Sequence, residues 1–327
     1  MILLLASLCL VIAASTSNAA SIPKKQIPCD PQRTGFKVRY QKEITDYKDN
    51  AVFLMPGEIL KLEVLEKIPR NYRCEFKSGQ AMEGSNAYCT EDPIRTWSWK
   101  VPDSAGVYPI DIHRDMGNDS MKFNVFVMVP ASELKGEYLK GYRIGNYPET
   151  FEKSPKFYEA PRGYIKLDSK SAHTKVSPHF RLDQFVCKQS ANFPAYLFLK
   201  ERPILKLEWM LERANYAGYR CSTFNVMSGY RTPFYNRLIG NVRNSAHQFG
   251  GAADILIDEN PADGEMDDLN QDGKLDEADV DIFVSLADTL TQAAEPSLFI
   301  GGTGKYLKSR WHPSFVHVDV RGFRALW

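Results

Sequence analysis

The segment Ser245-Ala246-His247-Gln248-Phe249-Gly250-Gly251-Ala252-Ala253-Asp254 carries the strongest structural signal in this chain. Its paired glycines allow the backbone to turn tightly and to approach neighbouring segments closely. Residues 252–257, which follow them, are small or apolar apart from Asp254 and predict a buried strand. We therefore expect His247 to lie on a loop and Asp254 on the strand that this loop enters.

A second segment, Phe315-Val316-His317-Val318-Asp319-Val320-Arg321, alternates polar and apolar residues. This alternation places His317 and Asp319 on one face of a strand and the three valines on the other face. Together with His247 and Asp254, His317 completes a set of two imidazoles and one carboxylate. Such a set suits a zinc ion whose fourth coordination position stays open. The sequence therefore predicts a metal centre with His247, Asp254 and His317 as ligands.

These two segments, together with Ser228-Gly229-Tyr230-Arg231, resemble the motifs of the D-Ala-D-Ala carboxypeptidase-like zinc metallopeptidases. This family is related to the vancomycin-resistance dipeptidase, to phage L-alanyl-D-glutamate endolysins and to the hedgehog domain. The subgroup with a C-terminal F-V-H-V-D-x-R is the most similar, and the resemblance covers roughly residues 180–327. It implies an α+β fold in which a small antiparallel sheet carries the zinc ligands, and it implies peptidoglycan stem or cross-link peptides as substrate.

The resemblance also implies roles for residues around the metal. Arg231 is expected to bind substrate or to stabilise an oxyanion, tasks that suit a permanently charged guanidinium; a structural ion pair is the alternative. Ser245 is a candidate substrate-binding residue that is also expected to support the loop or the His247 ring.

One position departs from the family pattern. Several members carry an acidic base three residues before the second histidine, where this chain has Ser314. Asp319 is therefore the candidate general base because it shares a face with His317. Its alternative role is a hydrogen bond that orients a metal ligand, and His312 is a weaker candidate base.

An acidic loop separates the two metal motifs. Its donor spacing is that of a twelve-residue EF-type calcium loop, with Gly273 at the turn position six and Leu275 at the apolar position eight. We expect a single dockerin-like loop with a structural role; the alternative is a solvated acidic loop. The expected ligands are Asp268, Asn270, Asp272, Lys274 through its carbonyl, Asp276, and Asp279 in place of the usual glutamate.

The chain before the metal motifs is rich in predicted strands. Short alternating or apolar stretches between turn residues predict a β-sandwich-like module over residues 20–130, with a spacer or wall-binding role. Residues 131–179 are expected to be a connector to a peptidase domain at 180–327, with the calcium loop inserted at 268–279. The strands expected are 51–55, 59–64, 96–101, 123–129 and 224–227, and the helices expected begin at Arg181, Pro203, Tyr235 and Val280. In the helix from Pro203, the spacing allows Leu205, Leu207, Met210 and Leu211 to share one apolar face.

The N-terminus has the pattern of a signal peptide over residues 1–19. Met1 to Ala14 is almost wholly apolar, and Ser17-Asn18-Ala19 fits a cleavage site; the alternative is an apolar end of a cytosolic protein. We expect export across the inner membrane to the periplasm, where disulfides form. The candidate pairs are Cys74 with Cys89 and Cys187 with Cys221.

Composition excludes some classes of partner. The formal net charge of the 327 residues is +1, so there is no polybasic signature for nucleic acid. No later segment is apolar enough to predict a membrane span. The expected activity is zinc-dependent hydrolysis of wall peptides. The alternatives are a non-catalytic zinc-containing cell-wall-binding module and an amidase that acts on other peptides.

Overall fold

The computed structural model describes residues 32–66, 70–77, 84–85, 95–115, 118–149, 154, 156–189, 192–289 and 299–327. The predicted signal peptide, Cys29 and Cys89 lie outside these residues, and so does the predicted Cys74–Cys89 pair. Within the described ranges, no helix has the length and apolar character needed to cross a membrane.

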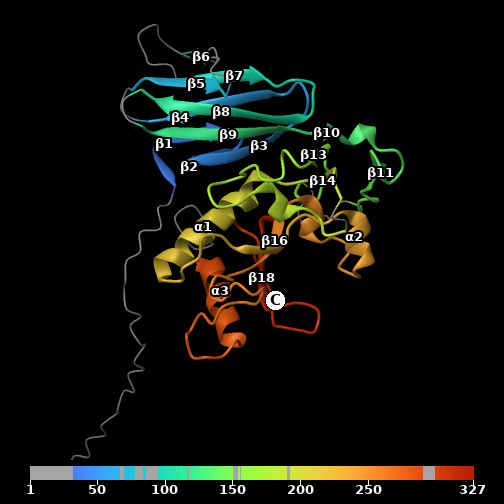
Figure 1. Cartoon of the computed structure of the whole chain (residues 1–327). Coiled ribbons are helices and arrows are strands. Elements are labelled where there is room, and N and C mark those ends of the chain that lie inside the picture. The colour runs from blue at the N-terminus through green and yellow to red at the C-terminus, as the bar shows by residue number, and fades with distance from the viewer. Residues whose placement is uncertain are drawn as a thin grey trace, which may run out of the picture.

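Two sheets face each other across an apolar core in the N-terminal part (Figure 1). Alternation along the strands builds this core: in β1, for example, every second residue from Thr34 to Tyr40 is buried. The predicted strands at 51–55, 59–64, 96–101 and 123–129 are confirmed to within a few residues. One sheet has the order β2-β1-β4-β7-β6, with β1 (Arg33–Tyr40), β2 (Glu43–Tyr47), β4 (Ile59–Leu65), β6 (Gly84–Ser85) and β7 (Thr96–Lys100). The other has the order β3-β9-β8-β5, with β3 (Asp49–Leu54), β5 (Tyr72–Phe76), β8 (Gly106–Arg114) and β9 (Ser120–Val127).

The remaining sheets lie in the C-terminal part. The largest has the order β15-β16-β18-β17-β19, with β15 (Asn225–Ser228), β16 (Ala252–Leu256), β17 (Gly302–Tyr306), β18 (Phe315–Asp319) and β19 (Ala325–Leu326). Two small antiparallel sheets contain β10 (Val129–Pro130), β13 (Gly163–Leu167) and β14 (Ala195–Leu197), and β11 (Tyr138–Leu139) with β12 (Tyr142–Arg143). Residues expected to form a connector, such as Ile144 and Tyr164, are buried in the same core as Val316 and Ile255.

Helix α1 (Glu201–Ala217) lies between the two parts of the chain (Figure 1). Leu207, Met210 and Leu211 belong to the large C-terminal core, as predicted. Leu205, which was expected on the same face, packs instead with Tyr47 of β2 and with Phe299. The prediction of a single apolar face was therefore wrong, because the helix is covered on two sides.

Shorter helices complete the C-terminal part. They are α2 (Pro233–Leu238), α3 (Glu277–Thr289) and the 3-10 turns η1 (Ala131–Glu133), η2 (Leu182–Phe185) and η3 (Ala246–Phe249). The helix expected to begin at Arg181 is only the turn η2. Mainly antiparallel sheets, with the parallel pairs β3–β9 and β17–β19, and few helices are compatible with the predicted α+β class.

The predicted pairing of Cys187 with Cys221 is wrong. Cys187 is a buried free thiol whose sulfur lies 3.9 Å from Thr232 Oγ1. The sulfur of Cys221 contacts the amide of Asn215 and the carbonyl of Tyr219. Both cysteines therefore pack as small apolar side chains in this structure.

Leu207→Ala tests the importance of the buried α1 face. Leu207 is fully buried, so the substitution leaves a cavity and should lower the free energy of unfolding by about 2–5 kcal/mol. Leu238→Ala is the matched control, because Leu238 is 66% exposed and its loss should change stability by less than about 0.5 kcal/mol. Urea denaturation measures both, and equal effects would contradict the central position of α1.

Candidate metal centre

Strand pairing brings the predicted ligands together. In the C-terminal sheet, Asp254 of β16 lies directly opposite His317 of β18. Ser228 of β15 pairs with Asp254, and Gly304 of β17 pairs with His317. Directly opposed residues of antiparallel strands project from the same face. These four residues therefore form one row across the sheet, with both ligands at its centre.

His247 reaches this row from the turn η3, which is fully buried. Gly250 ends the turn in the left-handed region, with φ 61°. A Cβ atom at Gly250 would lie 2.5 Å from the carbonyl oxygen of Phe198, so a larger residue would displace the turn. Phe249 of the turn packs against Tyr147 and Tyr158. The glycine and the aromatic cluster together hold His247 over the strand that carries Asp254.

The three ligand atoms converge on one point. Asp254 Oδ1 lies 3.0 Å from His247 Nε2 and 2.8 Å from His317 Nδ1, and these two nitrogens are 3.1 Å apart. A tetrahedral zinc ion with bonds of about 2.0–2.1 Å needs ligand atoms roughly 3.3 Å apart. The spacing is thus close to that of a zinc site. Among the described residues, this is the group of three histidine, cysteine or acidic side chains close enough to hold a metal ion.

Acceptors on the far side of both imidazoles determine where the ring protons lie. The Gly229 carbonyl accepts from His247 Nδ1 at 2.6 Å, and the Asp319 carboxylate accepts from His317 Nε2 at 3.2 Å. In the neutral rings, lone pairs then remain on the other two nitrogens, which face Asp254 Oδ1. Converging lone pairs repel one another unless a proton or a cation lies between them. The donor set therefore fits a divalent metal ion.

The pKa values of the ligands follow from the same contacts. Burial, followed by the charge of Arg231, lowers the pKa of His247 to about 4. Burial also acts to lower the pKa of His317, but hydrogen bonds to Asp254 and Asp319 outweigh it and raise that pKa. Burial acts to raise the pKa of Asp254, yet the two histidines hold it well below its usual value. At neutral pH, Asp254 is thus ionised and His247 neutral, the forms that bind metal.

Arg231 contacts the ligand set directly. Its Nη2 forms an ion pair with Asp254 Oδ2, and its Nε donates to Ser228 Oγ at 2.8 Å. The guanidinium is nearly buried, and its position leaves Asp254 Oδ1 to the histidines. Ser245 is also buried and precedes η3, where its carbonyl accepts from the Gln248 backbone at 3.1 Å. Both residues contribute contacts that hold the ligands in place.

Asp319 is fully buried, and both of its carboxylate oxygens have partners. Oδ1 accepts from the backbone N–H groups of Gly302 at 2.8 Å and Arg321 at 3.0 Å. Oδ2 accepts from the Arg321 guanidinium and from His317. Burial acts to raise the pKa of Asp319, but His317 and Arg321 outweigh it and hold the pKa far below its usual value. A carboxylate with so low a pKa is a weak proton acceptor at neutral pH.

Two supporting residues were missed in the sequence. Arg321 stands in the quoted motif, 2 residues after Asp319, and this short sequence separation was the available signal. Lys206 on α1 carried no signal, because it lies outside every recognised motif. Its Nζ donates to the backbone carbonyl of Asp319 at 2.9 Å and to that of Phe299 at 3.2 Å. Burial lowers the pKa of Lys206 to about 8. These residues fix the end of β18 beside the ligand His317.

The acidic loop forms a separate feature next to the C-terminal sheet. Asp268, Asn270 and Asp272 accept hydrogen bonds from backbone N–H groups within the loop. Asp279 is buried and accepts from the backbone of Leu269 at 2.8 Å. Within the described residues, the loop carboxylates do not gather into a second three-residue group like that of the metal centre. The remaining expected ligands, Lys274 and Asp276, are exposed.

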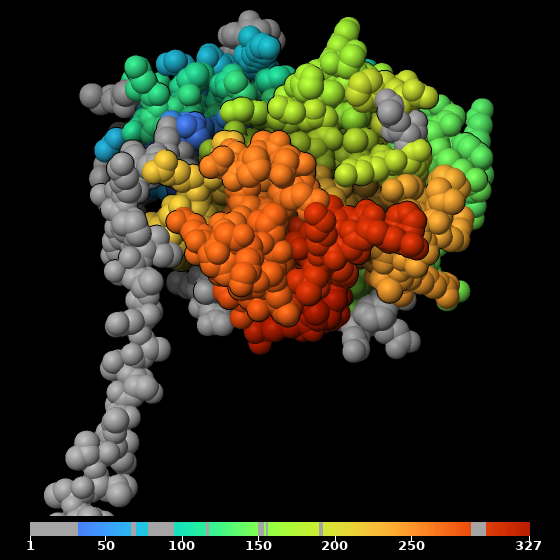
Figure 2. Space-filling view, turned by 60° about the horizontal axis from the view of Figure 1, so that its bottom comes forward, coloured from blue at the N-terminus to red at the C-terminus, as the bar shows by residue number. Residues whose placement is uncertain are grey.

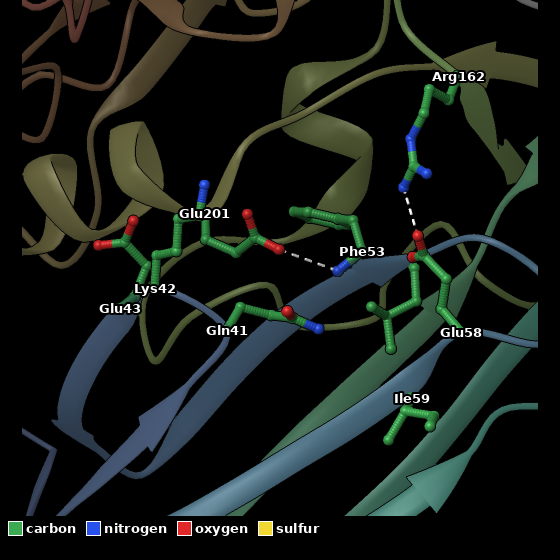
Figure 3. Close-up of a pocket in the computed structure, with 9 residues that line it drawn as sticks. Gln41, Lys42, Glu43, Phe53, Glu58, Ile59, Arg162 and Glu201 are labelled. Atoms are coloured by element: carbon green, nitrogen blue, oxygen red, sulfur yellow. Dashed lines mark hydrogen bonds and ion pairs between the residues drawn. The ribbon is translucent and has the colours of Figure 1, made fainter. Parts of the chain in front are cut away.

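A cavity of about 410 Å³ lies away from the metal centre, between the two sheets of the N-terminal part and the start of α1 (Figure 3). Glu201 Oε1 accepts from the backbone of Phe53 there at 3.1 Å, and Arg162 pairs with Glu58. The cavity is lined by Gln41, Lys42, Glu43, Phe53, Leu54, Glu58, Ile59, Arg162 and Glu201. Since this lining includes no predicted site residue, the candidate site rests on ligand geometry.

Comparison with known proteins finds a family match for part of the chain. Residues 178–273 match the family described as Peptidase M15, which confirms the predicted relationship to the D-Ala-D-Ala carboxypeptidase-like zinc peptidases. The match includes Arg231, His247 and Asp254 and ends before His317. The chain has no significant match among curated protein sequences.

Several solved structures are similar to part of the chain. The titin M10–obscurin-like 1 Ig complex is 20% identical, with a TM-score of 0.18, and the similarity covers 29% of this chain and 98% of that chain. The titin M3 domain is 16% identical, with a TM-score of 0.17 and coverage of 28% and 97%. Human titin ZIg10 is 12% identical, with a TM-score of 0.18 and coverage of 36% and 90%.

Asp319→Asn tests the support of His317. The amide keeps the size of the side chain but removes the charge that orients the imidazole and raises its basicity. We expect zinc affinity to fall by about 10–100-fold, as for other groups that hold a metal ligand. Competition with a chromogenic chelator measures the affinity. Asp263→Asn, at an exposed position outside the centre, is the control, and equal affinities of the two variants would contradict the assignment.

Proposed function

Because residues 178–273 match the Peptidase M15 family, we propose that this chain is a zinc-dependent peptidase that hydrolyses peptidoglycan stem or cross-link peptides. The observation that carries the proposal is the convergence of His247 Nε2, Asp254 Oδ1 and His317 Nδ1 on one point. Three protein ligands of this kind leave a coordination position for water or substrate. A zinc ion bound there supplies Lewis-acid polarisation of a carbonyl and activates water near neutral pH.

Asp319 serves in this proposal as a positioning residue. Its contacts with Arg321, Gly302 and His317 use both oxygens, so proton transfer to it would disrupt an established network. Its negative charge instead orients the His317 ring and makes the ligand nitrogen more basic. This supports the second of the two roles that the sequence left open.

Arg231 is proposed to maintain positive charge at the reacting centre. Its ion pair with Asp254 fixes the ligand carboxylate. A guanidinium beside the metal would also stabilise the negative oxygen that develops when an amide carbonyl is attacked. Ser245 is proposed to act through the loop, because its side chain is buried at the start of η3.

A non-catalytic zinc-containing cell-wall-binding module is the second candidate function. The observation that favours it is the lack of an acidic residue at Ser314, combined with the fully bonded state of Asp319. A metal centre without a competent base would bind a carbonyl or carboxylate without cleaving a bond. Function belongs to the site and not to the fold, so the two candidates are separated only by an assay for products.

Export to the periplasm is part of the proposal. The apolar run Met1–Ala14 and the small residues that follow it support a signal peptide. Peptidoglycan peptides are the proposed partners in that compartment. Formal net charge of +1 provides no support for nucleic acid as a partner.

Product analysis tests the peptidase directly. Protein with verified zinc is incubated with intact peptidoglycan and with free stem peptides, and products are identified by mass spectrometry. We expect cleavage of an amide bond in the peptides. His247→Ala removes one of three ligands and should lower the rate by about 1,000-fold or more, since the metal contributes several kcal/mol to the barrier.

His173→Ala is the matched control for this assay. The His173 side chain is 75% exposed and lies outside the metal centre, so its loss should leave the rate unchanged. Release of D-alanine would identify a carboxypeptidase, and cleavage of cross-links an endopeptidase. Full zinc occupancy without cleavage of any wall substrate would favour the binding module, and cleavage of other peptides alone would favour the amidase.

We also propose that the loop 268–279 binds calcium and stabilises the part of the protein that lies beside the metal centre. Donor spacing supports this, and so does Gly273, whose φ of 83° permits the sharp turn. The loop leads into α3, which packs against β17 and β18. On the surface, the orange segment that includes the loop lies beside the red C-terminal segment (Figure 2). Calcium would therefore stabilise a helix that contacts the strand carrying His317.

Calcium addition at constant zinc tests this loop. Protein freed of calcium and reloaded with zinc should gain roughly 5 °C in melting temperature at saturating calcium, because a ligand that binds only the folded state stabilises it. Asp272→Asn should lose the gain, whereas Asp263→Asn, outside the twelve positions, should keep it. Unchanged melting temperature and activity on calcium removal would show that the loop is only a solvated acidic segment.

A further inference from the structure

Trp327 lies beside the metal ligand His317. The centroids of their rings are 5.3 Å apart, with planes tilted by 43°. His317 is 6% exposed, whereas Trp327 is 48% exposed, so the indole lies between the imidazole and solvent on one side. No motif in the sequence assigned a role to this residue, although its ring packs against a predicted metal ligand.

The backbone around Trp327 is fixed by the sheet. Strand β19 pairs in parallel with β17 through Gly302 and Thr303. The Trp327 backbone N–H donates to the Thr303 carbonyl at 3.3 Å, and its carbonyl accepts from Lys305 at 2.8 Å. The indole Nε1 donates to the Tyr306 hydroxyl at 2.8 Å. Pairing with β17 thus fixes the backbone of Trp327, and the hydrogen bond to Tyr306 fixes its indole ring.

Two glycines of β17 leave the space that the indole fills. A Cβ atom at Gly304 would lie 2.6 Å from Trp327 Cε2 and Nε1. One at Gly302 would lie 2.8 Å from the far edge of the same ring. Gly304 is the residue opposite His317, so the indole covers the face of the sheet that carries the ligand. Any side chain at Gly304 would have to displace Trp327.

Trp327 also contacts the residues that orient His317. The Arg321 guanidinium carbon lies 5.1 Å from the centre of the indole ring, within the range of cation–π attraction. Arg321 in turn binds Asp319 through its Nε at 2.7 Å, and Asp319 accepts from His317 Nε2. The Trp327 ring therefore packs against His317 and also against Arg321, which supports His317 through Asp319.

We propose that Trp327 is a positioning residue of the metal centre, which restricts the His317 ring and shields the Arg321–Asp319 pair from water. The inference rests on the proposed zinc function. Rotation about the bond to an imidazole ring is soft, so neighbouring atoms must define its angle. Water would also weaken the attraction between Arg321 and Asp319 if the indole were absent. Both effects should lower the affinity for zinc without removing a ligand.

Zinc affinity of the full chain is the primary measurement, by competition with a chromogenic chelator. Trp327→Ala should weaken binding by about 10–100-fold, the range for groups that hold a metal ligand. Trp327→Phe restores most of the ring and should recover most of the affinity. Gly304→Ala, which displaces the indole without changing it, should weaken binding in the same direction. Trp311→Ala is the matched control, because Trp311 is 78% exposed and stacks on Arg310.

Cobalt substitution provides a readout that a general loss of stability would not change. The visible spectrum of bound cobalt reports ligand geometry, so Trp327→Ala should alter its bands, whereas Trp311→Ala should leave them unchanged. If wild-type protein binds no zinc, the proposed function fails before this inference is tested. If wild-type protein binds zinc and folded Trp327→Ala matches Trp311→Ala in affinity and spectrum, the positioning role is overturned. Should Trp327→Ala not fold, Gly304→Ala decides: weaker zinc binding with altered cobalt bands supports the role, and a match to Trp311→Ala overturns it.

Discussion

The register between β16 and β18 determines whether a metal centre exists at all. Asp254 and His317 come from distant parts of the chain and meet only because these strands pair with the two residues directly opposed. A slip of one residue would turn one ligand to the other face of the sheet. The register is protected by the valines of β18, which must remain in the apolar core when His317 faces the site. Core packing and ligand geometry therefore depend on the same alignment, and Ser228 and Gly304 extend it to the outer strands.

Buried charge is the second constraint on this region. Asp254 and Asp319 are both buried, and buried charges are costly unless they are paired and hydrogen-bonded. Arg231 forms an ion pair with Asp254, and Arg321 forms one with Asp319. His317 contacts both carboxylates. Lys206 adds a buried cation from α1, the helix that also packs against Tyr47 of the N-terminal part. The centre is thus balanced by residues from several elements, so a change in one of them alters the electrostatics of the others.

Local pattern in the sequence was sufficient for the ligands but not for their surroundings. The spacing of His247, Asp254 and His317, and the alternation in β18, predicted which side chains share a face, because strand geometry is local. The sequence offered an ion pair as an alternative for Arg231 but did not indicate Asp254 as its partner. This partner, and the burial of Leu205 against Tyr47, depend on distant segments. The Cys187–Cys221 pair failed for a related reason: a shared compartment permits a disulfide, whereas only the fold brings two sulfurs together. Trp327 lacked any signal, since its role arises from glycines on another strand.

The surroundings of Asp319 connect structure to chemistry. A general base must gain and lose a proton during each cycle, and its pKa is best placed near the working pH. Asp319 has the opposite environment, because Arg321, His317 and two backbone N–H groups all stabilise its ionised form. These contacts are what a group needs when it must keep an imidazole in one tautomer throughout catalysis. If zinc binds at this site, the charge of Asp319 would hold the His317 ring in one tautomer and would keep His317 Nδ1 available as a ligand.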